Sequence, residues 1–385
     1  MRYILFASIA LTIMSCAKNE GTSIQRLEEP NLPAESYLYS NLVLPPNTFV
    51  PNDGIVIDFI DIGTPPFKGE ITINDEMATL GRVLFYDTKL SLNNTISCGS
   101  CHLQAKAFAD GQQFSHGFEG RMTNRNSMAI INPVLQRNLF WDSRSFSISD
   151  LSLKPVQNHI EMGMEDMDVL ENKLSETDYY DRLFWNAFGD TQVTKERISE
   201  ALTQFVSSIT TANSKFDQRV RSEVNTFTPL EELGMQVFHS DRAKCGSCHA
   251  GNNFSAQDGP DDPYGGGSGI GGDDLKGTTN IGLDLVAKDK GRVDGMFRIP
   301  SLRNIALTAP YMHDGRFKTL EEVIDHYRFG IKPSKDLDVK FTDGHGNVRM
   351  LNISETEKFA LIAFLNTLTD ETMTKDIKYS DPFKP

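Results

Sequence analysis

The pentapeptide CGSCH occurs twice in this chain of 385 residues, at 98–102 and again at 245–249. Each copy places an imidazole directly after the second of two thiols. A Cys-x-x-Cys pair alone would suit a redox dithiol or half of a zinc site, but neither box has a second Cys or His pair at the usual zinc spacing. The adjacent histidine instead indicates attachment of a c-type haem, in which the thiols bind the vinyl groups and the imidazole is the proximal iron ligand.

Haem of this type is attached outside the cytoplasm, and the N-terminus predicts export. Arg2 precedes the apolar run YILFASIALTIM, which has the length of a signal peptide and is too short for a comfortable membrane span. The run ends in IMSC, which resembles a bacterial lipobox with Cys16 as the lipidated first residue. The alternative is a plain secretory signal followed by a stray cysteine. We expect a periplasmic lipoprotein whose one contact with a membrane is its lipid anchor.

The cysteine count agrees with this division, since one thiol serves the lipid and four serve two haems. The five cysteines are Cys16, Cys98, Cys101, Cys245 and Cys248. A net charge of −14, from 38 basic and 52 acidic residues, argues against a nucleic-acid partner and fits a basic electron-transfer protein as the partner. The alternative is acidity that serves solubility alone.

Helical signals dominate the rest of the chain. TPLE at 228–231 and SETE at 354–357 are capping boxes, and an amphipathic pattern predicts a long helix around 194–212. Alternating strand patterns are scarce, so we expect a mainly α fold with few or no strands. Trp185 lies outside every motif, and we expect it in a core.

The same signals suggest four segments. These are a signal peptide at 1–16, a tether with an irregular segment at 17–70, and two haem-binding halves at 71–225 and 226–385. Within the second half, the glycine-rich insertion at 258–277 predicts a mobile loop, because ordering so much glycine costs a large conformational entropy.

The residues around the two boxes resemble the bacterial dihaem cytochrome c peroxidase family, including its MauG-like branch. The stretches that carry the resemblance are LGRVLFYDTKLSLNNTISCGSCH, FADG, RNSMAIIN, LFWDSR, IEMG, CGSCHAG, NIGL and FRIPSLRNIALTAPYMHDGRFKTLEEVIDHY. The resemblance implies two cytochrome c-like haem domains packed face to face, with peroxide reacting at the N-terminal haem and electron transfer at the C-terminal haem. It also implies a cytochrome-c peroxidase that takes electrons from cytochrome c or a similar donor, and a homodimer.

The family's site residues match this sequence position by position. His102 and His249 match the proximal ligands, each with the two cysteines of its box as thioether positions. Trp141 matches the tryptophan between the haems, although an interface aromatic would also be a core residue. Glu161 matches the distal glutamate that moves a proton during peroxide cleavage. The glutamine that the family places ten residues after the tryptophan is Leu151 here, which removes one polar group from the pocket.

His116, in FSHGFEG, resembles the loop histidine that caps the peroxidatic haem in the resting form of many members. Two observations keep the alternative of a plain loop histidine open. The gap from His116 to the following RN motif is two residues longer than in the family, and many MauG-like relatives lack this ligand.

At the second haem, the position that carries methionine in the peroxidases and tyrosine in the MauG-like branch is Tyr327. Thr319 begins a capped helix in which Tyr327 shares one apolar face with three other residues, Leu320, Val323 and Ile324. The alternatives are a tyrosine that only packs on the haem, and a thioether ligand from Met296 or Met312.

The resemblance also implies a calcium ion between the domains, held by the side chain of Asn126 and the backbone carbonyls of Thr308 and Pro310. Two other functions stay open at this point. One is a MauG-like, peroxide-dependent oxidase that modifies a protein partner, and the other is a dihaem electron-transfer cytochrome with no catalytic role.

Overall fold

The computed structural model describes residues 26–46, 72–136, 138–222, 225–256, 277–343 and 345–385. The predicted signal peptide with Cys16 and nearly all of the glycine-rich insertion lie outside the described residues, and of the predicted tether only 26–46 is described. No helix in the described part of the chain is both long and apolar enough to cross a membrane.

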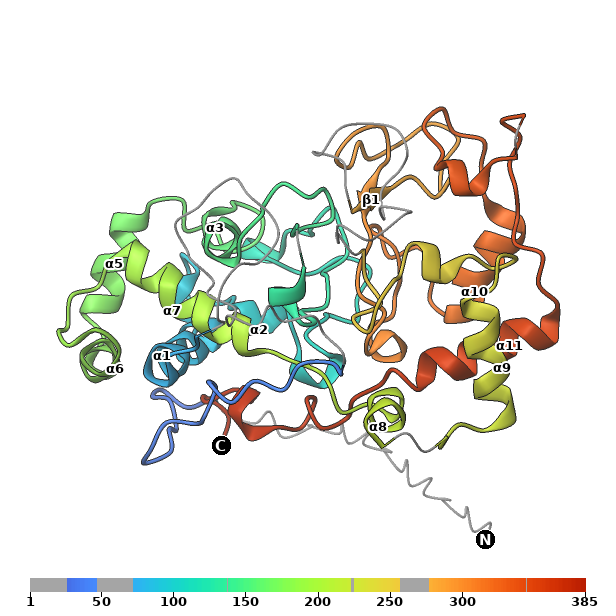
Figure 1. Ribbon diagram of the computed structural model, residues 1–385. Coiled ribbons are helices and arrows are strands. Elements are labelled where there is room, and N and C mark those ends of the chain that lie inside the picture. The colour runs from blue at the N-terminus through green and yellow to red at the C-terminus, as the bar shows by residue number, and fades with distance from the viewer. Residues whose placement is uncertain (1–25, 47–71, 137, 223–224, 257–276, 344) are drawn as a thin grey trace, which may run out of the picture.

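The described chain is mainly helical, as predicted, and its two-stranded sheet is small. The helices are α1 (Asp75–Tyr86), α2 (Cys98–Cys101), α3 (Ile148–Ser152), α4 (Lys154–Gln157), α5 (Met167–Ser175), α6 (Asp178–Phe188), α7 (Lys195–Ser208), α8 (Lys215–Ser222), α9 (Pro229–Phe238), α10 (Leu320–Asp325) and α11 (Glu355–Asn366). Strands β1 (Thr278–Thr279) and β2 (Phe297–Arg298) pair antiparallel, with Thr278 opposite Arg298. Short 3₁₀ turns and long loops connect these elements. In Figure 1, α1 to α7 occupy one side of the molecule, and α9, α10 and α11 occupy the other.

Each half is built on one close helix crossing, and the two crossings are alike. In the first half α1 packs on α7, and in the second α9 packs on α11. A glycine lies at each contact: a Cβ added to Gly81 would lie 1.9 Å from the carbonyl oxygen of Ala201, and one added to Gly234 would lie 1.9 Å from that of Ala360. Both helix pairs therefore approach so closely that only glycine fits.

Helix starts follow the sequence signals. The predicted capping boxes form at the N-termini of α9, from Thr228 and Glu231, and α11, from Ser354 and Glu357. A side-chain cap also begins α1, where Asn74 accepts a hydrogen bond from the backbone N–H of Met77. These caps satisfy N–H groups that the first helical turn leaves without partners.

The two halves have separate hydrophobic cores, and two segments cross the predicted boundary between them. One core combines α1, α6 and α7, and the other combines α9 and α11. Phe216 of α8 packs in the second core, whereas Tyr379 and Phe383 of the C-terminal tail pack in the first. The tail is bonded there as well, since Tyr86 donates its hydroxyl hydrogen to the carbonyl oxygen of Tyr379 at 2.6 Å. The division at 225 stays a prediction.

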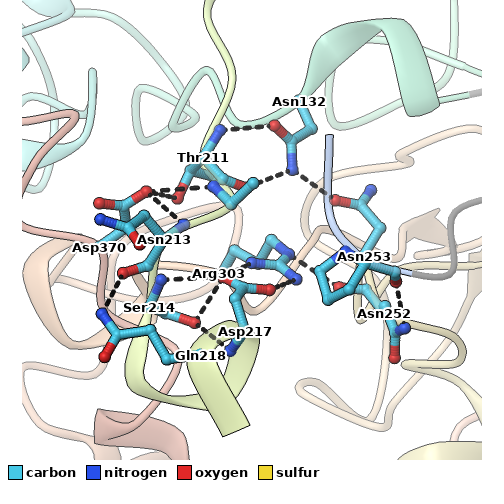
Figure 2. A network of polar contacts seen from close by, with 12 residues as sticks. Asn132, Thr211, Asn213, Ser214, Asp217, Gln218, Asn252, Asn253, Arg303 and Asp370 are labelled. Atoms are coloured by element: carbon cyan, nitrogen blue, oxygen red, sulfur yellow. Dashed lines mark hydrogen bonds and ion pairs between the residues drawn. The ribbon is translucent and has the colours of Figure 1, made fainter. Parts of the chain in front are cut away.

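A buried polar network joins the halves (Figure 2). The Asn132 side chain accepts a hydrogen bond from the Thr211 backbone N–H at 2.8 Å and donates to the Asn253 side chain at 3.1 Å. Beside it, the Arg303 guanidinium makes two hydrogen bonds to the Asp217 carboxylate, at 2.7 and 2.8 Å. None of these side chains has a buried polar atom without a hydrogen-bond partner among the described residues, as is usual for buried polar groups.

Trp185 corrects one expectation, because 59% of its surface is exposed. The buried face of α6 is formed by Tyr180, Leu183, Phe184 and Ala187. Those positions recur at helical spacing, and Trp185 comes one residue after Phe184, about 100° away around the helix.

Candidate functional site

A cavity of about 1020 Å³ lies between the two halves, and both CGSCH boxes open onto it. Its wall includes the four cysteines and two histidines of the boxes, namely Cys98, Cys101, His102, Cys245, Cys248 and His249. The volume is at the upper limit of ordinary small-molecule pockets. The fold therefore brings two motifs that are far apart in the sequence to one shared space.

Both histidines are oriented by backbone carbonyl groups. The Nδ1 of His102 lies 2.8 Å from the carbonyl oxygen of Phe108, and the Nδ1 of His249 lies 3.2 Å from that of Phe254 and 3.1 Å from that of Pro300. Nδ1–H therefore donates in each case, which leaves Nε2 unprotonated, with its lone pair available to a metal. Burial lowers the pKa of both imidazoles, that of His249 to about 4. A neutral imidazole with its second nitrogen anchored in this way is the form that binds iron.

The loops that anchor the histidines are alike. After the first box, Leu103 pairs with Ala109 in a short antiparallel bridge, and after the second, Ala250 pairs with Ser255. Each bridge closes a tight loop that returns a carbonyl group to the preceding imidazole. The two boxes thus share local structure as well as sequence.

The four cysteines of the boxes are free thiols. Burial raises the pKa of Cys98 to about 12 and that of Cys101 to about 11, and it raises the pKa of Cys245 to about 12. Neutral thiols facing a largely apolar cavity suit thioether formation with haem vinyl groups. Among the described residues, no group of three or more His, Cys, Asp or Glu side chains could hold a metal ion.

Glu161 lies on the cavity wall at the end of a tight turn. The side chain of Asn158 accepts hydrogen bonds from the N–H groups of Ile160, at 2.8 Å, and Glu161, at 3.3 Å. The N–H of Phe118 then donates to the carbonyl oxygens of Ile160 and Glu161, at 2.8 and 2.9 Å. A Cβ on Gly117 would lie 2.1 Å from the Ile160 oxygen, so glycine is required where these segments meet. Burial raises the pKa of the Glu161 carboxyl, and the charge of Arg144 opposes that rise.

Trp141 also lines the cavity, and both halves hold it. Its indole N–H donates to the carbonyl oxygen of Asn126 at 2.9 Å, while its own carbonyl oxygen accepts from the Arg298 N–H at 2.8 Å. The flanking residues add an ion pair, Arg125 with Asp142 at 2.6 Å. Leu151, at the family's glutamine position, is on the same wall.

The helix predicted to present Tyr327, α10, begins at its capping box, as expected, but it ends at Asp325, and Tyr327 lies in the π-helical turn that follows, His326–Gly330. Leu320, Val323, Ile324 and Tyr327 all line the cavity. The Tyr327 ring stacks on Phe341, with centroids 5.6 Å apart. Burial raises the pKa of the Tyr327 phenol, so an ionised phenolate here needs a nearby cation such as iron. Of the two thioether alternatives, Met312 is among the described cavity-lining residues and Met296 is not. Ligation by Tyr327 stays a prediction.

The structure does not bring His116 into the cavity. Its side chain is exposed, whereas its neighbours Ser115 and Gly117 line the cavity. His116 forms a bridge with Met122 in extended backbone, where successive side chains point to opposite sides. In this conformation it is a loop histidine, and resting ligation would require the loop to rearrange.

The predicted calcium residues border the same cavity. Asn126, Thr308 and Pro310 are all on its wall. The Asn126 side chain donates to the carbonyl oxygen of Gln112 at 2.7 Å, which turns its amide nitrogen away and leaves the amide oxygen for a cation. Calcium stays a prediction.

The charged wall residues that were not singled out from the sequence include Arg144 and Arg298. Each lies within a stretch that carries the family resemblance, LFWDSR and FRIPSLRN, and that position was the one available signal.

Comparison with known proteins agrees with the fold and the site. Residues 75–225 match the family described as di-haem cytochrome c peroxidase. The cytochrome-c peroxidase IdrP1 of Pseudomonas sp. (strain SCT) is 30% identical over 80% of this chain and 84% of its own length. The methylamine utilization protein MauG of Methylophilus methylotrophus is 27% identical over 79% of this chain and 84% of its own length.

Among solved structures, a MauG-like protein associated with microbial copper homeostasis superposes with a TM-score of 0.71 at 31% identity, covering 84% of this chain and 99% of that protein. The fold and the site together define a c-type dihaem protein. This chain belongs to the di-haem cytochrome c peroxidase family.

Proposed function

We propose that this protein is a dihaem cytochrome c peroxidase, which reduces hydrogen peroxide to water with electrons from an external cytochrome or small redox protein. The observation that carries the proposal is one cavity shared by both CGSCH boxes, with a half-buried carboxyl group, Glu161, on its wall. When bound, the two haems supply the redox chemistry, one iron as the peroxide site and the other as a store of one electron.

Glu161 is the group on this chain that would move a proton. Reduction of one hydrogen peroxide to two waters consumes two electrons and two protons. As the O–O bond breaks, a proton must pass from one peroxide oxygen to the other. The raised pKa of Glu161 brings the carboxyl nearer to neutral pH, where it can accept that proton and return it. The turn at Asn158 fixes the backbone of the residue that carries the carboxyl.

Trp141 is the residue between the halves that would carry electrons from one haem to the other. Its indole N–H and its carbonyl oxygen are both hydrogen-bonded, one within the first half and one to the second. A residue whose backbone is bonded to one half and whose side chain is bonded to the other keeps a constant position between the groups on either side of it. We propose that Tyr327 binds the second iron and that Asn126, Thr308 and Pro310 hold calcium. Export, a lipid anchor at Cys16, a periplasmic location and a homodimer are part of the same proposal.

A second candidate is a MauG-like oxidase that uses peroxide to modify a protein partner. Tyr327 and Leu151 on the cavity wall favour it, since tyrosine is the MauG-like residue at its position and Leu151 departs from the glutamine of the family. Poor oxidation of reduced cytochrome c, together with a long-lived oxidised state after peroxide addition, would favour this candidate. A non-catalytic electron-transfer cytochrome would instead fail to bind cyanide in the half-reduced protein.

Two measurements test the main proposal. The denatured protein is expected to show a c-type pyridine haemochrome at two haems per chain, and to keep its haem after acid–acetone extraction. Peroxide should then drive steady-state oxidation of reduced cytochrome c. One haem, bound zinc, or no activity in both the pre-reduced and the fully oxidised protein would contradict the proposal.

A further inference from the structure

Two buried arginines near the domain boundary differ in how their charges are balanced. Arg303 donates two hydrogen bonds to the carboxylate of Asp217 and a third, at 2.8 Å, to the carbonyl oxygen of Asn252 (Figure 2). Neither side chain of this ion pair is exposed to solvent. The chain supplies Arg303 with its own counter-ion, as a buried guanidinium requires.

Arg298 has no such partner. It is 7% exposed, and its guanidinium donates to the side-chain oxygen of Gln136 at 2.6 Å and contacts the sulfur of Met128 at 3.5 Å. Its Nε is buried without a hydrogen-bond partner. Within the described residues Arg298 forms no ion pair with a carboxylate. Burial lowers its pKa to about 10, so the side chain is still a cation at neutral pH.

The position of Arg298 indicates that its counter-ion would come from an occupant of the cavity. Arg298, Gln136 and Met128 all line the cavity that the two CGSCH boxes share. The backbone N–H of Arg298 donates to the carbonyl oxygen of Trp141, and Pro300, two residues later, accepts from the His249 imidazole. The guanidinium is therefore in the wall of the haem cavity and on the segment that runs between the central tryptophan and the second proximal histidine.

A haem brings carboxylates into such a cavity as its two propionates, and a planar guanidinium matches a carboxylate with paired hydrogen bonds. Hydrogen peroxide, the other expected occupant, is neutral at pH 7. We propose that Arg298 is the counter-ion of a haem propionate at the domain boundary and thereby sets the reduction potential of that haem. This inference rests on the haem attachment proposed above.

The expected sign follows from electrostatics. A propionate that is paired with a cation places less net negative charge beside the iron, which disfavours the more positive ferric state. Removing the guanidinium therefore lowers the potential of the haem concerned. It also leaves that propionate free to take up a proton, so the potential becomes dependent on pH.

The test is a spectroscopic redox titration of Arg298→Met, with Arg298→Lys as the variant that keeps the charge. Haem content is counted first in each sample. With two haems per chain, the reduction potential of one haem should be lower in Arg298→Met than in the wild type. In Arg298→Lys that potential should be close to the wild-type value. The wave that moves identifies whether the first or the second haem contributes the propionate.

Three results would overturn the inference. If Arg298→Met binds two haems per chain and neither reduction potential moves, the inference about Arg298 is wrong, while the proposed function is unaffected. If the chain does not bind two haems, both the inference and the proposed function are wrong. A wild-type potential that depends on the concentration of added chloride or phosphate would assign the counter-ion to a soluble anion. Should Arg298→Met fail to bind haem, the shorter neutral variant Arg298→Gln gives the same comparison.

Discussion

The two halves of the chain share their scaffold and differ in what faces the shared cavity. Each half has a helix crossing at a glycine, a CGSCH box and a loop that returns a carbonyl group to the proximal histidine. The wall contributed by the first half includes a half-buried carboxyl, Glu161, and that of the second includes a half-buried phenol, Tyr327. Under the proposed function, one scaffold used twice serves two tasks, with Glu161 assigned to proton transfer and Tyr327 to iron ligation.

The largest expected effect is that of Glu161→Gln. The amide cannot accept the peroxide proton, so kcat/KM for hydrogen peroxide should fall by about 10²–10⁴-fold. Steady-state assays with reduced cytochrome c measure the fall, and haem content should stay at two per chain. Glu165→Gln, which alters an exposed carboxyl nearby, is the matched control and should leave the rate unchanged. A wild-type rate in Glu161→Gln would contradict the assignment of proton transfer to the first half.

The helix crossings offer a second comparison. Gly81→Ala and Gly234→Ala should each destabilise the protein by about 1–3 kcal/mol or more, because the new methyl group meets a backbone carbonyl that cannot move aside. Urea unfolding measures the loss. Glu200→Ala, on the exposed face of α7, should change the free energy of unfolding by no more than about 0.5 kcal/mol. If one glycine variant is as stable as the wild type, the two crossings are not equivalent.

Tyr327→Phe probes the iron ligand of the second half. If the phenolate binds iron, its loss should alter the ferric spectrum and raise the potential of that haem, because an anionic donor that stabilises ferric iron is gone. Stability should change little, since the ring that stacks on Phe341 remains. Visible spectra and redox titration measure both effects. An unchanged ferric spectrum would make Tyr327 a packing residue.

The smallest expected effect concerns pH. The charge of Arg144 lowers the pKa of Glu161, while burial raises it. Arg144→Gln removes the lowering influence, so the acidic limb of the kcat/KM profile should move to higher pH, and the rate should fall severalfold on that limb only. Because Arg144 is partly exposed, salt screens its effect, and high salt should move the wild-type limb in the same direction. Arg144→Lys, which keeps the charge, should restore the wild-type profile.

Much of the fold and part of the site could be predicted from the sequence because the signals were local. Capping boxes name helix starts through contacts between residues three apart, and they form at Thr228, Thr319 and Ser354 as predicted. Trp185 was assigned to the wrong environment because one residue along a helix turns a side chain by about 100°, and a lone aromatic does not reveal the buried face.

The unbalanced charge of Arg298 was out of reach for a different reason. Whether a buried cation has an anion depends on which distant carboxylates the fold brings near it. Arg303 forms an ion pair with Asp217, which is 86 residues earlier in the chain. Arg298 forms no ion pair with a carboxylate within the described residues. No local pattern distinguishes these two arginines, although they are five positions apart.

By itself the sequence determined the chemistry of attachment, since Cys-x-x-Cys-His needs only neighbouring residues to define two thioether positions and an iron ligand. Only the tertiary structure decided that both boxes open onto one cavity, that Glu161 and Tyr327 are on its wall, and that His116 is outside it. The physical reason is one of range: covalent attachment and helix capping involve residues a few positions apart, whereas a shared cavity and its charge balance arise from packing between segments far apart in the chain.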